Sequence, residues 1–305
     1  MVAVGGGHGL SASLRAVRRY AGSITAVVSV ADDGGSSGRL RAEMPELPAP
    51  GDVRTCLAAL AADGSPFARI LEHRFDDGDL EGHALGNLIL AALAHELGSF
   101  AAAVDEVGAR VGAVGRVLPA TVGPVALEAL VAPRGEGPPA DGPSGPATRV
   151  VGQVAVQNAS GVYQVRLRPD DASSSPDVGA AIEAADQVIL GPGSLFTSVL
   201  AAAIVPAVHR ALRATGAQRI YVANLAPELP ETAGFTVADE VRVLAEHGVE
   251  VDVVVVDEQR VVGRRDDGIC WVQAPVADDR SLVHHPERLA AVLAALAPTS
   301  APPPV

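Results

Sequence analysis

The sequence predicts an α/β fold with a mainly parallel sheet, helices on both faces of that sheet, and a small antiparallel β excursion. Short apolar runs alternate with helical patterns in both halves of the chain, which is typical of βαβ units. Between about residues 115 and 170 the pattern changes to short alternating segments, which indicates the excursion. We expect a single domain over residues 1–297, a flexible Pro/Gly-rich loop over 132–149, and a disordered tail over 298–305.

The first half of the chain predicts two strands, four helices and the excursion. Strands are expected at residues 1–4 and 24–30, because each is a short apolar run. Helical patterns cover residues 11–20, 52–62, 84–97 and 100–111. The excursion is expected to use the segments 116–122, 125–131, 149–156 and 162–168.

The α/β rhythm returns in the second half. Ser175 and Pro176 predict the start of a helix, because serine is a favoured N-cap and proline suits the first helical position. Strands are expected within the segments 187–194, 218–225 and 251–257. Residues 259–276 are expected to be irregular or to form a hairpin around Asp267 and Gly268, before a final helix over 286–296.

Charge and composition exclude several classes of protein. The net charge of −13 argues against nucleic acid or an anionic membrane as the main partner. The chain has no lysine, which rules out a Walker A or Schiff-base lysine, so anionic ligands must be met by arginine and backbone N–H groups. The two cysteines, Cys56 and Cys270, make no disulfide framework. With no signal-peptide pattern and no apolar run of the roughly 20 residues that a membrane helix needs, we expect a cytoplasmic protein without a membrane span.

A glycine-rich turn follows the first expected strand, in the stretch VAVGGGHGLS. Gly6, Gly7 and Gly9 allow the backbone to approach a phosphate, and the next helix supplies N–H donors. The dinucleotide pattern G-x-G-x-x-G fails, because its third glycine position is Leu10. Tight packing alone also produces such turns. His8 could contact a phosphate or a ribose, or be an ordinary polar loop residue.

The second expected strand leads into the polar stretch SVADDGGSSGRLR, at the edge of the sheet where open α/β sheets bind ligands. Asp32 and Asp33 could bind a ribose or hold Mg²⁺ together with ligand phosphates. The glycines allow the backbone to wrap closely, Ser36 and Ser37 offer hydroxyls, and Arg39 can bind a phosphate through two N–H groups. A solvated turn with aspartate caps is the weaker interpretation.

Two further stretches place polar groups at expected helix starts. Asp52 in APGDVRTCL is explained as an N-cap, whereas Arg54 opposes the helix dipole unless an anion lies nearby. In HALGNLIL, Asn87 is either a hydrogen-bonding group of the first turn or a ligand contact. His83 alone is more often a structural donor than a base.

The stretch LGPGSLFTSVL is the second candidate anion cradle. A strand ends, Gly191 and Gly193 flank a turn, and Ser194 opens a helix with Thr197 in its first turns. The stretch is not a G-x-S-x-G nucleophile elbow, and neither a Ser/His/Asp order nor a zinc-type Cys/His spacing is found. After the next strand, Asn224 and the pair Glu231 and Thr232 could close over the site or belong to an ordered loop.

Seven motifs occur together in one order. They are GGGHGLS, VADDGGSSGRLR, PGDVRTCLAAL, GHALGNLIL, GRVLPAT, GPGSLFTS and NLAPELPETAGFT. In this order they resemble the gluconeogenesis factor (YvcK-type) proteins of the CofD-like superfamily, over about residues 2–257. The resemblance implies a Rossmann-like fold, binding of UDP-sugars such as UDP-N-acetylglucosamine or UDP-glucose, and a role in cell shape and wall synthesis during gluconeogenic growth.

The resemblance also implies which residues contact the ligand. They are Gly6, Gly7, Asp32, Ser36, Arg39, Asn87, Gly193, Ser194 and Asn224. His8 stands where many family members have threonine, and the region after Asp257 matches the family least.

Three functions follow from these observations. The first is a regulatory nucleotide-sugar binder, with the diphosphate at the two glycine turns. The second is a transferase like the CofD enzymes, which move a phospholactyl group to a deazaflavin precursor with Mg²⁺, and for which Asp32 and Asp33 are natural metal ligands. The third is an oxidoreductase that binds an NAD-like dinucleotide, which Leu10 disfavours. The motifs favour the first function; a homodimer is compatible with the sequence.

Overall fold

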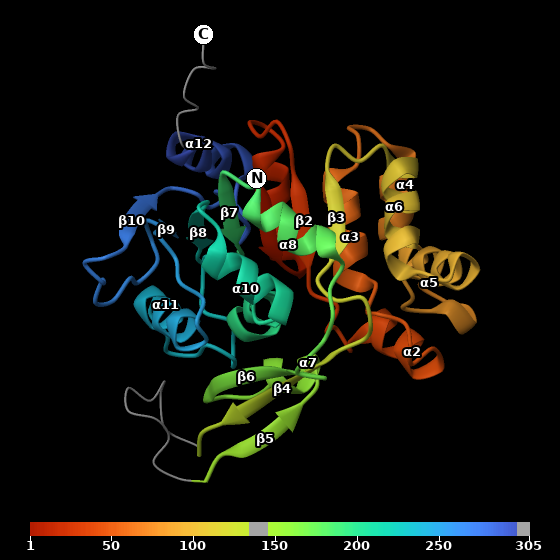
Figure 1. Cartoon of the computed structure of the whole chain (residues 1–305), viewed down its shortest axis with the longest axis horizontal. Coiled ribbons are helices and arrows are strands. Elements are labelled where there is room, and N and C mark those ends of the chain that lie inside the picture. Colours follow the sequence, from red (N-terminus) through yellow and green to blue (C-terminus); the bar gives the residue numbers. More distant parts are fainter. Residues whose placement is uncertain (134–145, 298–305) are drawn as a thin grey trace.

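The computed structural model of the chain describes residues 1–133 and 146–297. It confirms the predicted α/β fold, because seven parallel strands form one sheet in the order β10-β9-β8-β7-β1-β2-β3 with helices on both faces (Figure 1). A smaller antiparallel sheet has the order β5-β4-β6. The predicted tail at 298–305, and residues 134–145 of the predicted loop, lie outside the described residues.

The strands of the large sheet are short and rich in valine. They are β1 (Val2–Gly5), β2 (Thr25–Val28), β3 (Arg116–Pro119), β7 (Gln187–Leu190), β8 (Gln218–Val222), β9 (Val253–Asp257) and β10 (Cys270–Ala274). Every residue of β1, β7 and β9 is buried, as expected for parallel strands that are covered by helices on both faces. Because β1 pairs with both β2 and β7, the loops after these three strands lie at one edge of the sheet.

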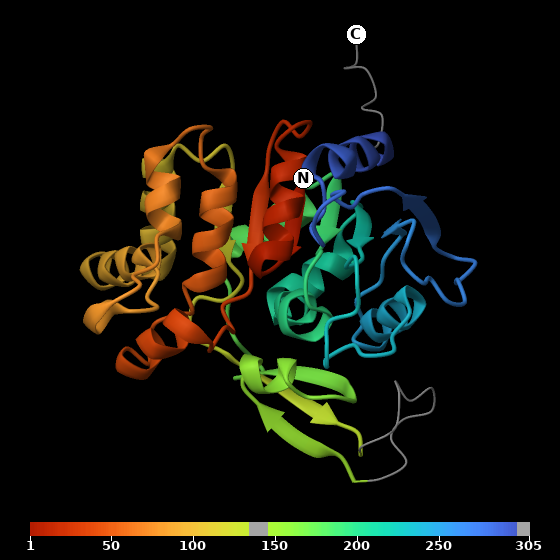
Figure 2. The ribbon, with the colours of Figure 1, turned by 180° about the vertical axis from the view of Figure 1, so that it is seen from behind.

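The helices cover the two faces of the large sheet. On one face α1 packs against α3 and α12, and on the other α8 packs against α10, as the two opposite views show (Figures 1 and 2). The helices are α1 (Gly7–Val17), α2 (Gly35–Glu43), α3 (Gly51–Leu60), α4 (Pro66–Glu72), α5 (Leu85–Leu97), α6 (Phe100–Val111), α7 (Gln153–Gln157), α8 (Pro176–Glu183), α9 (Ala201–Ala203), α10 (Pro206–Ala214), α11 (Val237–Glu246) and α12 (Pro286–Leu296). A 3₁₀ turn (Gly78–Leu80) and a π-helix (Leu195–Leu200) complete the set.

The antiparallel sheet is smaller than the sequence predicts. Its strands are β4 (Ala126–Val131), β5 (Thr148–Val151) and β6 (Val162–Arg168), so β5 begins inside the predicted loop 132–149. The expected segment 116–122 instead supplies β3, which pairs in parallel with β2 at the edge of the large sheet. Part of the expected segment 149–156 is helix α7, which begins where the Asp33 carboxylate accepts hydrogen bonds from the N–H groups of Gln153 and Val154.

Two other predictions about local structure are wrong. The polar stretch after β2 is not a wrapping loop, because Gly35–Glu43 forms helix α2 and buries Ser36 and Ser37. Of the irregular or hairpin structure predicted over residues 259–276, the irregular part is right for 259–269, but no hairpin forms around Asp267 and Gly268. Strand β10 pairs in parallel with β9 as the last strand of the large sheet, so the chain crosses over between them without a helix.

Across the described residues, no single helix has both the length and the apolar composition needed to cross a membrane. One bent pair of helical segments, Leu195–Ala203 with Pro206–Ala214, is long and apolar enough only when the two segments are taken together.

Candidate functional site

A cavity of about 690 Å³ lies at the carboxyl ends of β1, β7 and β8, where the sequence predicts ligand binding. We call it the strand-end cavity. It brings together both glycine turns, the loop after β8 and the start of α7. The predicted site residues that line it are Gly6, Gly7, His8, Gly9, Asp52, Gly193, Ser194 and Asn224.

The two glycine turns touch each other across this cavity. A Cβ atom on Gly9 would lie 2.4 Å from the carbonyl oxygen of Pro192, so only glycine permits this approach. A Cβ atom on Gly6 would lie 2.3 Å from the Asp52 carboxylate. Packing against the Pro192 backbone therefore requires glycine at position 9, whereas a side chain at position 6 would have to displace the Asp52 carboxylate.

Asp52 occupies the N-terminus of α1, where the sequence predicts a phosphate. The backbone N–H of Gly7 favours the ionised form of its carboxylate, and the dipole of α1 also favours a negative charge there. Burial and, to a lesser extent, the nearby Asp32 carboxylate raise the pKa of Asp52 to about 7, although Gly7 and Arg54 act in the opposite direction. The first cradle therefore already holds a carboxyl group of the chain.

The second glycine turn is also filled from within the chain. The Gly193 N–H donates to the Asn224 side-chain oxygen at 2.8 Å, and the Ser194 hydroxyl donates to the Glu228 carboxylate at 2.8 Å. Glu231 accepts hydrogen bonds from the N–H groups of Phe196 and Thr197 and from the Thr197 hydroxyl. The loop after β8 thus supplies acceptors to groups that the sequence predicts to be donors for phosphate oxygens.

The polar stretch after β2 lies beside the strand-end cavity, and its side chains make hydrogen bonds within the chain. The Asp32 carboxylate accepts the Gly34 N–H, and Asp33 holds the start of α7. Arg39 donates to the carbonyl oxygens of Asp79 and Glu81. Asp32, Asp33, Ser36, Ser37 and Arg39 are not among the described residues that line the cavity.

A buried hydrogen-bond network holds four predicted residues, Ser36, Arg54, His83 and Asn87. The Ser36 hydroxyl lies 3.0 Å from His83 Nδ1 and accepts a hydrogen bond from the Asn87 amide. Asn87 in turn accepts the Arg54 Nε–H at 3.1 Å, and Arg54 also donates to the Leu71 carbonyl oxygen. Arg54 therefore needs no ligand anion at the start of α3, because its guanidinium satisfies groups of the chain.

Two more predicted residues have structural partners. The Gly191 carbonyl accepts the Ser13 hydroxyl at 2.7 Å, and the Ser37 hydroxyl accepts the Gly51 N–H at 3.2 Å. In the part of the chain that the structure describes, no group of three or more His, Cys, Asp or Glu side chains could hold a metal ion. Binding of Mg²⁺ by Asp32 and Asp33 stays a prediction.

Sequence reasoning missed several residues of the cavity, among them Glu228, Gln153, Gln157 and His284. Glu228 lies within one of the seven motifs, although it was not among the predicted site residues. Gln153 and Gln157 belong to α7, and most of that helix falls in the segment 149–156 that was expected to be part of the β excursion. His284 comes from the C-terminal region; its Nε2 lies 3.2 Å from the Ala223 carbonyl oxygen, and burial lowers its pKa to about 4. Only the fold shows that these residues meet the glycine turns.

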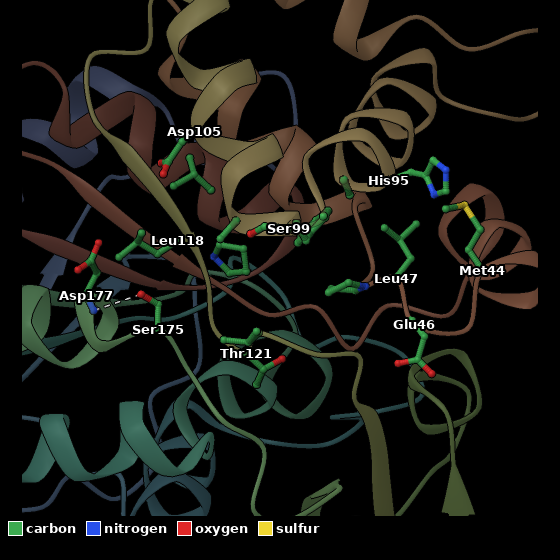
Figure 3. A pocket seen from close by; sticks show the side chains of 18 of the residues that line it. Met44, Glu46, Leu47, His95, Ser99, Asp105, Leu118, Thr121, Ser175 and Asp177 are labelled. Atoms are coloured by element: carbon green, nitrogen blue, oxygen red, sulfur yellow. Dashed lines mark hydrogen bonds between the residues drawn. The ribbon is translucent and has the colours of Figure 1, made fainter.

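A second cavity of about 620 Å³ lies beside β3 and shares no lining residue with the first among the described residues (Figure 3). Leu47 and Leu118 contribute to its largely apolar lining, and Asp105 and Asp177 lie at its rim. None of the predicted site residues is among the described residues that line this cavity.

The chain has an open parallel sheet with a cavity at the carboxyl ends of its strands. It therefore belongs to the class of open α/β proteins, in which this edge of the sheet is the usual place for a ligand. The family model described as 2-phospho-L-lactate transferase CofD matches residues 1–286. A Mycobacterium tuberculosis (strain CDC 1551 / Oshkosh) protein named "Putative gluconeogenesis factor" is 46% identical over 310 residues, covering 96% of this chain and 89% of the relative. The "Gluconeogenesis factor" of Halalkalibacterium halodurans is 38% identical over 260 residues, covering 84% and 76%.

A solved structure agrees with these relatives. The crystal structure of a UPF0052 family protein from Bacillus halodurans matches with a TM-score of 0.85 and 32% identity, covering 96% of this chain and 97% of the other. The chain therefore belongs to the CofD family, and it is similar to proteins named gluconeogenesis factors. The family resemblance of the motifs is confirmed.

Proposed function

We propose that this protein binds a nucleotide sugar, UDP-N-acetylglucosamine or UDP-glucose, in the strand-end cavity and acts as a regulator of cell shape and wall synthesis during gluconeogenic growth. The observation that carries the proposal is the meeting of two glycine turns, more than 180 positions apart in sequence, across one cavity. Its volume of about 690 Å³ falls in the range of small-molecule sites, roughly 300–1,000 Å³.

The polar lining supports a ligand with both a charged and a hydroxylated part. His8 is exposed beside the first turn, and the N–H groups of a first helical turn have no intrahelical acceptors. Ser194, Asn224 and Glu228 offer hydroxyl, amide and carboxylate groups to ribose or sugar hydroxyls. Because Asp52 and Glu228 place carboxyl groups in the same cavity, a diphosphate enters most favourably with Mg²⁺ as its counter-ion.

Calorimetric titration with UDP-N-acetylglucosamine, UDP-glucose, NAD and a deazaflavin precursor, each with and without Mg²⁺, tests the proposal. We expect saturable binding of the UDP-sugars and no product. Binding of the deazaflavin precursor that requires Mg²⁺ would favour the transferase that the family model describes. Binding of NAD alone would favour the dinucleotide alternative.

Variants locate the ligand within the fold. Ser194→Ala removes a hydroxyl from the cavity and is expected to weaken UDP-sugar binding about threefold to tenfold, the usual net value of one hydrogen bond. Ser160→Ala, at an exposed serine in the connection between α7 and β6, is the matched control. Arg39→Ala distinguishes two interpretations: no change is expected from the cavity geometry, whereas a large loss would place the diphosphate beside α2.

A further inference from the structure

The outer face of the small antiparallel sheet carries three arginines around one glutamate. Arg149 comes from β5, Glu128 from β4, and Arg166 and Arg168 from β6. We call these four residues the basic face. The small sheet lies at the opposite end of the molecule from α12 (Figures 1 and 2).

Glu128 fixes the three guanidinium groups in place. Its side chain is 1% exposed, whereas those of the arginines are 50–53% exposed. Its carboxylate lies 2.5 Å from Arg166 and 3.5 Å from Arg149, and it also pairs with Arg168. Burial alone would raise the pKa of Glu128, but the hydrogen bonds from Arg168 and Arg166 outweigh it and lower that pKa, so the carboxylate is ionised at neutral pH.

The basic face is positively charged, whereas the chain as a whole is negatively charged. Residues 126–133 and 146–168 contain three arginines and one glutamate, a net charge of +2, in a chain of net charge −13. One guanidinium group would be enough to neutralise Glu128. The other two leave a positive excess, and the guanidinium groups repel one another. An anionic partner would relieve that repulsion.

The opposite face of the small sheet is already used by the fold. Leu127, Ala129, Val165 and Leu167 are buried, and β6 packs against α9 and the π-helix. Because side chains alternate along a strand, the arginines between these residues point away from the body of the protein. The Val151 side chain, paired across from Glu128, is 52% exposed beside them.

We infer that the basic face is a docking surface for a carboxylate-rich segment of a partner protein. Arginine binds carboxylates through paired N–H groups and is enriched in protein interfaces. The anchoring by Glu128 holds the guanidinium groups in position before the partner arrives, which lowers the entropic cost of binding. A nucleic acid is disfavoured, because its long phosphate backbone would also meet the acidic remainder of the chain.

Fluorescence anisotropy of a labelled ten-residue polyglutamate peptide tests this inference. We expect the peptide to bind and to bind more weakly as NaCl rises from about 50 to about 200 mM. The double variant Arg149→Gln with Arg168→Gln should weaken binding about threefold to tenfold. The control replaces Arg15 and Arg213, exposed arginines on α1 and α10, by glutamine, and so loses the same charge elsewhere.

Folding of the variants is checked by far-UV circular dichroism. Arg149→Gln alone is the milder variant, because Arg166 and Arg168 still pair with Glu128. It should weaken the peptide about twofold with an unchanged spectrum. Three results would overturn the inference: no binding of the peptide, an equal loss in the control double variant, or equally tight binding of a labelled single-stranded DNA of the same length.

Discussion

Glu231 gives the sharpest test of the physical reasoning about the glycine turns. Its carboxylate is 1% exposed and accepts three hydrogen bonds from Phe196 and Thr197. Burial raises its pKa from 4.5 to about 7, despite these hydrogen bonds. A carboxyl whose pKa is higher in the folded than in the unfolded protein stabilises the fold at low pH, and that contribution is lost as the pH rises from about 4.5 to about 7.

The replacement Glu231→Gln keeps the shape and removes the ionisation. The glutamine oxygen can still accept the N–H groups of Phe196 and Thr197, and the Thr197 hydroxyl can turn to accept from the amide. A shift from 4.5 to about 7 corresponds to about 3 kcal/mol in total, of which about 2–3 kcal/mol falls between pH 5 and pH 8. We therefore expect the free energy of unfolding of the variant, relative to the parent, to rise by that amount over this pH interval.

Urea unfolding at pH 5, 6, 7 and 8 measures the difference, since contributions from other titrating groups cancel between the two proteins. Glu183→Gln, an exposed glutamate at the end of α8, serves as the control and should show no such trend. A constant difference between Glu231→Gln and the parent across the pH range would refute the reasoning, because Glu231 would then titrate alike in both states.

Two further changes test the site. Gly9→Ala places a methyl group 2.4 Å from the Pro192 carbonyl oxygen and should lower the free energy of unfolding by about 1–3 kcal/mol in urea, whereas Gly22→Ala, with nothing within 4 Å, should stay within about 0.5 kcal/mol. Glu228→Gln removes a negative charge from the cavity while keeping an acceptor for the Ser194 hydroxyl, so calorimetry without Mg²⁺ should show about fivefold tighter UDP-sugar binding. Weaker binding would mean that the Glu228 carboxylate itself binds the ligand.

The sequence predicts the large sheet well because its strands are apolar runs buried on both faces. It fails where burial does not involve apolar side chains. Helix α2 buries Ser36 and Ser37 and has no apolar periodicity, so its polar stretch resembles a loop. Strand β10 has only partly buried and exposed residues at the edge of the sheet, and nothing in its pattern distinguishes it from irregular structure.

The candidate site shows the same division. Glycine turns after strands are local features, and their meeting at one edge follows from parallel pairing. The carboxyl groups that fill them are not local: Glu231 lies 35 residues from Phe196 in sequence. Likewise Asp52 reaches the N-terminus of α1 from another helix. A pattern read along the chain can identify a donor turn, but it cannot show which distant acceptor already occupies it.

Because groups of the chain already occupy both glycine turns, a ligand that binds there must displace them. Gly9 packs directly on Pro192, so contacts within the chain set the spacing of the two turns. A phosphate at these turns would exchange with carboxyl and amide groups of the chain, and such an exchange of hydrogen bonds yields little net free energy. Affinity must then come from charge balance and from contacts to the rest of the ligand. Replacing a carboxyl group of the cavity is therefore more informative about binding than replacing a glycine, because it changes the charge balance and leaves the packing intact.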